Sequence, residues 1–367
     1  MQPATSPRAR RDEARLLAVD RDRGTVVDGD IADLPRLLRR GDLLVVNDAA
    51  TLPASLRARV ALAVGDAARG EATDLELRLA GPPGGPAARA VLFGAGDWRS
   101  PTERRPAPPA LAPGSALRLL VAGPEGHVHE DLSPVTATIT AVDPRHPRLV
   151  DLRFDRDGAE LWAALYRLGR PVQYSYLRAP LDLWSVQTAF AARPWAAEMP
   201  SAARPLAWST LLDLRRAGVG VAALTHAAGL SSTGDPSLDA ALPLPERYDL
   251  PAATVAAIAA ARARGGRVIA VGTTVVRALE GCHAARGRLV PGPGETDLVL
   301  SAAFVPRVVD GLLTGMHDPS ESHFNLLRAF AGDGVLLPAW RHAGERAYLQ
   351  HEFGDATLLI PGLARAA

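Results

Sequence analysis

RVIAVGTTVVRALE, at residues 267–280, passes from an apolar strand-like run straight into a helical pattern. Gly272, Thr273 and Thr274 form the turn between the two. A strand that ends where a helix begins is the building unit of α/β proteins, and such a junction presents free backbone N–H groups. The stretch therefore predicts an α/β fold in which these three residues hold a polar or anionic ligand. Arg277 follows about one helical turn later, so we expect its guanidinium at the same rim.

Segments on either side of this junction extend the pattern. Apolar runs at 42–47 and 220–225 are expected as further strands, and 210–216 and 252–264 as helices that glycine closes. Their alternation predicts a mainly parallel sheet.

The sequence pattern is different between residues 56 and 150. Short alternating apolar runs are separated there by Pro/Gly clusters, which is typical of a small β-barrel or a β-sandwich. We therefore expect an α/β domain built from residues 1–55 and 151–367, with an all-β domain at 56–150 inserted into it.

Length and composition limit the classes of function. A chain of 367 residues with 47% hydrophobic residues is expected to form two globular domains. It has no apolar run long enough for a membrane helix and its start does not resemble a secretory signal, so we expect a cytoplasmic protein without a membrane partner. The single cysteine, Cys282, leaves no cysteine cluster for a metal, and no metal is expected. All 41 Lys+Arg residues are arginine, which excludes lysine nucleophiles, and the net charge of +1 gives no general field for nucleic acid.

His226 is the first candidate catalytic residue. It follows the apolar run at 220–225 and precedes a segment rich in glycine and serine. An imidazole at the end of a strand is suited to act as an acid, a base or an orienting donor. A solvated histidine in a Gly/Ser turn would give the same pattern.

His317 is the second candidate. It follows the apolar run at 304–309 and precedes an expected helix that Ser322 or Ser320 would cap. Because a helix N-terminus favours negative charge on a ligand, His317 is predicted to lie beside such a ligand. The alternative is a helix cap with a surface histidine.

Aromatic and amide side chains gather between residues 171 and 190. Tyr174 and Gln187 belong to this group, and such side chains are able to stack on a purine and read its edge. The alternative is that they pack in the core.

Taken together, these segments resemble the S-adenosylmethionine:tRNA ribosyltransferase-isomerases of queuosine biosynthesis. The matching motifs lie in order between about Arg11 and Ile360. They include RDxxRLL at 11–17, GDLLVVN at 41–47, QTxF at 187–190, AVGTTVVRALE at 270–280, GETDL at 294–298 and VDGLLT at 309–314.

This resemblance implies an α/β domain with an inserted β-barrel and S-adenosylmethionine as a ribosyl donor. An amine on a 7-aminomethyl-7-deazaguanine base in tRNA attacks the ribose, adenine and methionine leave, and the ribose becomes an epoxycyclopentanediol. His226 and His317 would then be the acid–base residues. The residues expected to bind the donor or the substrate are Gly272, Thr273, Thr274, Arg277, Thr314, Ser322, Tyr174 and Gln187.

The chain departs from the family pattern in several loops. Residues 198–208 lack the family's Gly-Leu-His-Phe core, and residues 315–322 lack its lysine. Substitutions in loops on an intact frame leave the acceptor open between tRNA and a related small molecule. A non-catalytic module that binds S-adenosylmethionine or a nucleoside is the alternative from another class.

Overall fold

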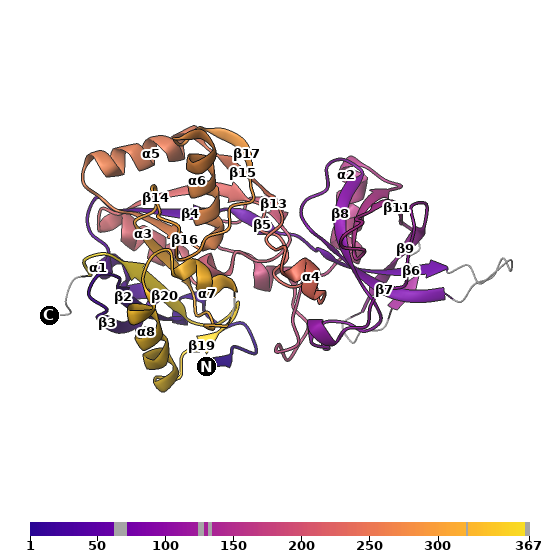
Figure 1. The fold of residues 1–367 in the computed structure, drawn as a ribbon, viewed down its shortest axis with the longest axis horizontal. Helices are drawn as coiled ribbons and strands as arrows, with labels where there is room; N and C mark the ends of the chain where they lie inside the picture. Colours follow the sequence, from indigo (N-terminus) through magenta and orange to yellow (C-terminus); the bar gives the residue numbers. More distant parts are fainter. Residues whose placement is uncertain (62–71, 124–127, 131–133, 321, 364–367) are drawn as a thin grey trace.

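The computed structural model describes residues 1–61, 72–123, 128–130, 134–320 and 322–363. Two lobes lie side by side in Figure 1: a layered α/β lobe that holds both ends of the described chain, and a β-barrel. None of the described helices has both the length and the apolar character needed to cross a membrane.

A nine-stranded sheet forms the centre of the α/β lobe. In spatial order its strands are β17 (Gly292–Thr296), β15 (Glu246–Leu250), β14 (Gly220–His226), β4 (Leu43–Asn47), β16 (Val268–Val271), β18 (Gly311–Gly315), β20 (Ala356–Ile360), β2 (Arg15–Asp20) and β3 (Val26–Asp30).

The sheet is mixed, whereas the sequence predicts a mainly parallel one. The pairs β14–β4, β4–β16, β16–β18 and β20–β2 are parallel, and the other four pairs are antiparallel. The central strands follow the helix–strand alternation. The outer strands do not follow it. The short turn between β2 and β3 can only join antiparallel neighbours, whereas the antiparallel pairs β15–β17 and β18–β20 join strands that are distant in the chain.

Helices cover both faces of this sheet. Helices α5 (Ala252–Ala263), α6 (Thr273–Arg286), α7 (Ser322–Leu327) and α8 (Asp333–Glu345) pack on one face, and α1 (Leu34–Leu37) and α3 (Trp208–Arg216) on the other. Alternate residues of β16 belong to the two cores, with Val268 and Ala270 in the first and Ile269 and Val271 in the second. A strand buried on both faces requires the continuous apolar run seen in the sequence.

The second lobe is a closed barrel. Its strands are ordered β9 (Ala116–Ala122), β11 (Thr136–Val142), β12 (Leu149–Phe154), β8 (Ala87–Phe93), β7 (Ala72–Leu79) and β6 (Ser55–Ala61), and β6 pairs again with β9; β10 (Val128–Glu130) is added beside β9. Helix α2 (Gly158–Leu168) buries Leu161 and Leu165 in the barrel core, so this core extends past residue 150.

The remaining strands and the remaining α-helix join the lobes or lie at their edges. They are β1 (Gln2–Pro3) with β19 (Leu349–Gln350), β5 (Ala49–Thr51) with β13 (Arg193–Ala196), and α4 (Pro236–Asp239). Strand β4 leads through β5 directly into barrel strand β6, so the carboxyl edge of the central strands faces the barrel.

Candidate functional site

The carboxyl ends of four parallel strands meet at one edge of the sheet. These strands are β14, β4, β16 and β18. The residues at or just after their ends are His226, Asn47, Gly272 and Thr314. Ligands of open α/β sheets bind at the carboxyl edge of the strands. The two predicted histidine segments and the glycine turn all lie at this edge.

Asn47 ties three of these segments together. Its Oδ1 accepts hydrogen bonds from the backbone N–H of His226 (2.9 Å) and of Ala49 (3.0 Å). Its Nδ2 donates to the carbonyl oxygen of His226 (3.0 Å) and to Oγ1 of Thr274 (3.4 Å). Asn47 is fully buried, and it uses its whole hydrogen-bonding capacity to fix His226 beside the start of α6.

His226 lies in a buried cluster with Glu246 and Arg277. The imidazole is fully buried, and its Nε2 is 3.3 Å from Oε2 of Glu246. Arg277 donates from Nη1 to the same carboxylate oxygen and from Nε to the carbonyl oxygen of Leu298 (3.0 Å). Among the residues described, neither ring nitrogen of His226 has a hydrogen-bond partner of proper geometry. A buried polar group without a partner is rare in proteins and is expected where a ligand completes the site.

Burial and neighbouring charges set the protonation states of this cluster. Burial, followed by the positive charge of Arg277, lowers the pKa of His226 from 6.5 to about 3. His226 is therefore neutral near pH 7. Burial raises the pKa of Glu246, although Arg277 and the N–H of Gly229 (2.6 Å) oppose this effect. The structure thus places Arg277 on Glu246, which the sequence did not predict.

The predicted glycine turn begins helix α6. Gly272 has a φ of +87°, which favours glycine, and its N–H donates to the carbonyl oxygen of Leu313 (2.7 Å). A Cβ at this position would lie 3.3 Å from Cβ of Ala202. Thr273 and Thr274 are the first two helical residues and are partly exposed. The first N–H groups of a helix have no acceptor within it, so this turn can receive polar or anionic groups.

Thr314 and His317 lie at the far end of the same edge. Oγ1 of Thr314 is 2.9 Å from Nε2 of His317, and His317 is half-buried. Strands β14 and β18 are separated by β4 and β16. Three strand spacings correspond to roughly 14 Å, so the two histidines would act on opposite ends of one ligand rather than on one atom.

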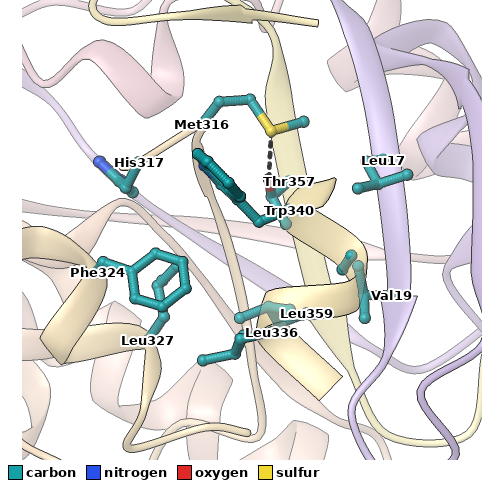
Figure 2. A pocket seen from close by; sticks show the side chains of 11 residues that line it. Leu17, Val19, Met316, His317, Phe324, Leu327, Leu336, Trp340, Thr357 and Leu359 are labelled. Carbon is teal, nitrogen blue, oxygen red and sulfur yellow. Dashed lines mark hydrogen bonds between the residues drawn. The ribbon is translucent and has the colours of Figure 1, made fainter. Parts of the chain in front are cut away.

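An apolar pocket adjoins His317 on its other side. Figure 2 shows His317 at its margin, with Met316, Phe324 and Trp340 among the lining side chains. The Oγ1 of Thr357 donates to Sδ of Met316 (3.0 Å) within this pocket. The lining comes from β2, β20 and the helices α7 and α8, which makes it part of the packing between sheet and helices.

Tyr174 belongs to a second polar cluster, between the lobes. Its hydroxyl donates to Oε1 of Glu198 and is 3.0 Å from Oγ of Ser231. Oε1 of Glu198 also accepts from the backbone N–H of Ser231 (3.0 Å). Since Gly229 binds Glu246 and Ser231 binds Glu198, the loop that starts at His226 joins the two clusters.

Gln187 and Ser322 complete the predicted set. The side-chain amide of Gln187 accepts from the N–H of Thr51 and donates to its carbonyl oxygen, both at 2.9 Å. This amide is therefore engaged in holding the chain near β5. Ser322 is the first residue of α7, and its side chain lies outside the described part of the structure.

Three groups of this region were not among the predicted site residues: the buried Asn47 and Glu246, and the half-buried Glu198. Asn47 ends a buried strand, where a polar residue is itself a signal. Glu246 and Glu198 stand in segments without a distinctive local pattern. In the described ranges no group of three or more His, Cys, Asp or Glu residues could hold a metal ion.

Known proteins resemble this chain over nearly its whole length. The family model described as "Queuosine biosynthesis protein" matches residues 1–359. A protein of Anaeromyxobacter dehalogenans named S-adenosylmethionine:tRNA ribosyltransferase-isomerase is 36% identical over 364 residues, which cover 97% of this chain and 95% of that protein. A protein of the same name from Thermosynechococcus vestitus is 34% identical, with 98% and 92% covered. The crystal structure of S-adenosylmethionine tRNA ribosyltransferase from Thermotoga maritima shares the fold, with a TM-score of 0.50, 23% identity, and 98% and 96% of the two chains covered.

Proposed function

Because the chain belongs to the queuosine biosynthesis protein family, we propose that it is an S-adenosylmethionine:tRNA ribosyltransferase-isomerase. It transfers the ribosyl part of S-adenosylmethionine to an amine and isomerises it. The acceptor is the 7-aminomethyl-7-deazaguanine base of a tRNA, which implies a cytoplasmic enzyme with two substrates, a small-molecule donor and an RNA.

The single observation that carries this proposal is the buried, neutral imidazole of His226 beside Glu246 at the strand edge. S-adenosylmethionine supplies a sulfonium whose positive charge acidifies the neighbouring 5′ carbon of the ribose. His226 has a free ring nitrogen and accepts a proton there. Glu246, 3.3 Å from Nε2, stabilises the imidazolium that results. Arg277 keeps the carboxylate of Glu246 in place.

The other predicted residues are assigned by their position along the edge. Gly272, Thr273 and Thr274 present the N-terminus of α6 to polar groups of the donor or the substrate. His317, held by Thr314 at the end of the edge opposite His226, donates a proton to the departing adenine.

Release of adenine and methionine tests this function. The purified protein is incubated with S-adenosylmethionine together with tRNA that carries the deazaguanine base, with the free base, or with no acceptor. We expect release only when the tRNA is present, and loss of release in His226→Gln. The control His146→Gln, at a half-buried position between barrel strands β11 and β12, should keep the wild-type rate.

Each other outcome of this experiment has a defined meaning. Release with the free base would identify a small acceptor in place of tRNA. Binding of the donor without release under any condition would support the non-catalytic module. No binding of the donor at all would overturn the proposal.

A further inference from the structure

Arg78 is a buried cation whose hydrogen bonds are incomplete. It lies on β7 and is only 1% exposed. Its Nε donates to Oε1 of Glu76 (2.7 Å), but its Nη1 is buried and has no hydrogen-bond partner among the described residues. An unpaired N–H of a buried guanidinium is costly, so a partner from outside the chain is expected.

The surrounding network fixes this guanidinium and leaves it positively charged. Glu76 binds Arg78 through one oxygen and Nη1 of Arg105 through the other (2.7 Å), and it accepts a further bond from Oγ of Ser55 (2.7 Å). The two arginines outweigh the burial of Glu76 and lower its pKa to about 2. Arg105 is also bound to the carbonyl oxygens of Gly94 (2.7 Å) and Ala95 (3.0 Å). One carboxylate therefore faces two guanidinium groups. Within the described part of the chain each nitrogen of Arg105 has a partner, whereas Nη1 of Arg78 has none.

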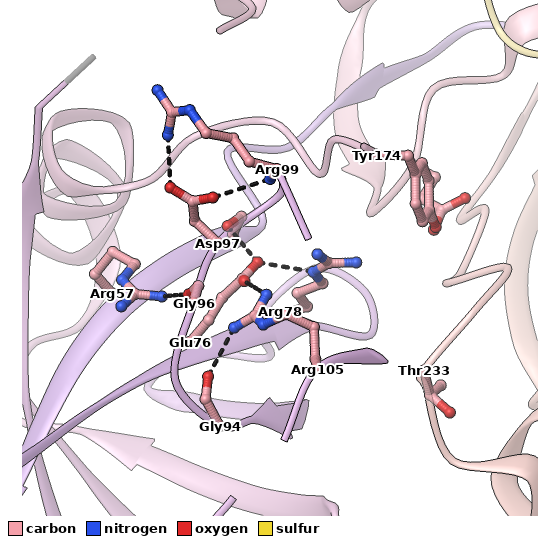
Figure 3. A network of polar contacts seen from close by, with 12 residues as sticks. Arg57, Glu76, Arg78, Gly94, Gly96, Asp97, Arg99, Arg105, Tyr174 and Thr233 are labelled. Carbon is pink, nitrogen blue, oxygen red and sulfur yellow. Dashed lines mark hydrogen bonds and ion pairs between the residues drawn. The ribbon is translucent and has the colours of Figure 1, made fainter. Parts of the chain in front are cut away.

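The free side of Arg78 faces the second polar cluster. Figure 3 shows its guanidinium directed toward Tyr174, and its Cζ lies 5.7 Å from the centre of the Tyr174 ring. The hydroxyl of Tyr174 donates a hydrogen bond to Oε1 of Glu198. Arg78 and Glu198 are close enough to influence each other's charge, yet they form no ion pair within 4.0 Å. A ligand with a negative group at one end and a positive group at the other would therefore match Arg78 and Glu198.

A small pocket continues from this cluster. Tyr174 and Glu198 line it together with the polar Gln173 and Glu352 and with apolar side chains that include Leu177, Leu181, Met199 and Phe353. The apolar side chains are suited to methylene groups. The loop from His226 to Ser231 leads from this cluster to the strand-edge site, because it binds Glu246 at Gly229 and Glu198 at Ser231.

We propose that Arg78 and Glu198 bind the amino-acid end of the donor. The carboxylate of the methionine part accepts hydrogen bonds from Nη1 of Arg78, the ammonium group binds Glu198, and the methylene chain lies against Tyr174. A phosphate would satisfy Arg78 but would be repelled by Glu198, so a zwitterionic amino acid is the ligand that matches both charges. This inference rests on the proposed use of S-adenosylmethionine.

The experiment compares S-adenosylmethionine with its decarboxylated form, which lacks only the carboxylate. For the wild-type protein we expect kcat/KM and the affinity measured by calorimetry to be at least tenfold higher for S-adenosylmethionine, because a charge-assisted hydrogen bond in a buried site is lost without the carboxylate. Arg78→Gln should reduce this preference to within about threefold. The variant should bind S-adenosylmethionine more weakly than the wild type does, and its affinity for the decarboxylated donor should be unchanged.

Two comparisons separate recognition from folding. Arg59→Gln removes a surface ion pair with Asp74 on the neighbouring strand and should keep the full preference. If Arg78→Gln does not fold, as judged by its thermal transition, Glu198→Gln decides: it should abolish the preference for S-adenosylmethionine over the analogue that lacks the α-amino group.

A wild-type protein without a preference, or a folded Arg78→Gln that keeps it, would overturn the inference. Calorimetry needs no turnover. A protein that binds the donor with the expected preference but releases no adenine would therefore contradict the proposed function and leave this site intact.

Discussion

Replacing His226 with glutamine tests the electrostatics of the site through protein stability. The pKa of His226 is about 3 in the folded protein and 6.5 without the surrounding structure. Between these values the unfolded chain binds a proton that the folded chain does not, so stability falls as the pH is lowered from about 6.5. From pH 7 to pH 4.5 this single group should cost about 2.5 kcal/mol, since one pKa unit corresponds to about 1.36 kcal/mol.

The assay is denaturant unfolding at both pH values for the wild type and His226→Gln. The backbone bonds of residue 226 to Asn47 do not depend on the side chain, so the variant keeps the frame of the site. The wild type should lose about 2.5 kcal/mol more than the variant over this interval. The raised pKa of Glu246 acts in the opposite direction and is present in both proteins. Equal pH dependence in the wild type and His226→Gln would refute the burial of a neutral imidazole.

Three further substitutions probe the rest of the edge. His317→Ala should lower turnover at least tenfold, or more than ~1.4 kcal/mol, with an unchanged melting temperature; unchanged turnover would exclude His317 from the reaction. Gly272→Ala should lower stability by about 1–2 kcal/mol and raise the KM for the donor, because φ is +87° and Ala202 is close. The matched control Gly287→Ala has a φ of +69° and no described atom within 4 Å, so it should cost stability without changing KM; a raised KM in both would assign the effect to unfolding. Asn47→Ala should lower the free energy of unfolding by roughly 2–4 kcal/mol in a denaturant titration and reduce turnover, and a loss below about 0.5 kcal/mol would contradict its joining role.

The sequence predicts those parts of the fold that depend on local pattern. The run at 268–271 is apolar throughout because its alternate residues face two different cores, and the glycine at 272 is required by its backbone conformation and by Ala202. The alternating runs of the barrel follow from strands with one buried face. The antiparallel outer strands could not be predicted, because they depend on how β15 and β20 return beside strands that are distant in the chain.

Side-chain contacts between residues that are distant in the sequence could not be predicted from local pattern either. Arg277 has the expected position on α6, but its direction is set by Glu246, which is 31 residues away. Asn47 appears in the sequence as a residue that ends a strand, whereas its four hydrogen bonds reach as far as Thr274. Arg78 stands in an alternating barrel strand, where a charged residue is normally expected to face solvent. Burial of such charges is decided by tertiary packing, which composition and spacing do not record.

A crystal structure of the protein with S-adenosylmethionine, or with an unreactive analogue of it, tests the central claim most directly. We predict that the ribose lies against His226 and the N-terminus of α6, with the amino-acid end at Arg78 and Glu198. A donor bound elsewhere, such as in the apolar pocket between the sheet and α8, would contradict the account.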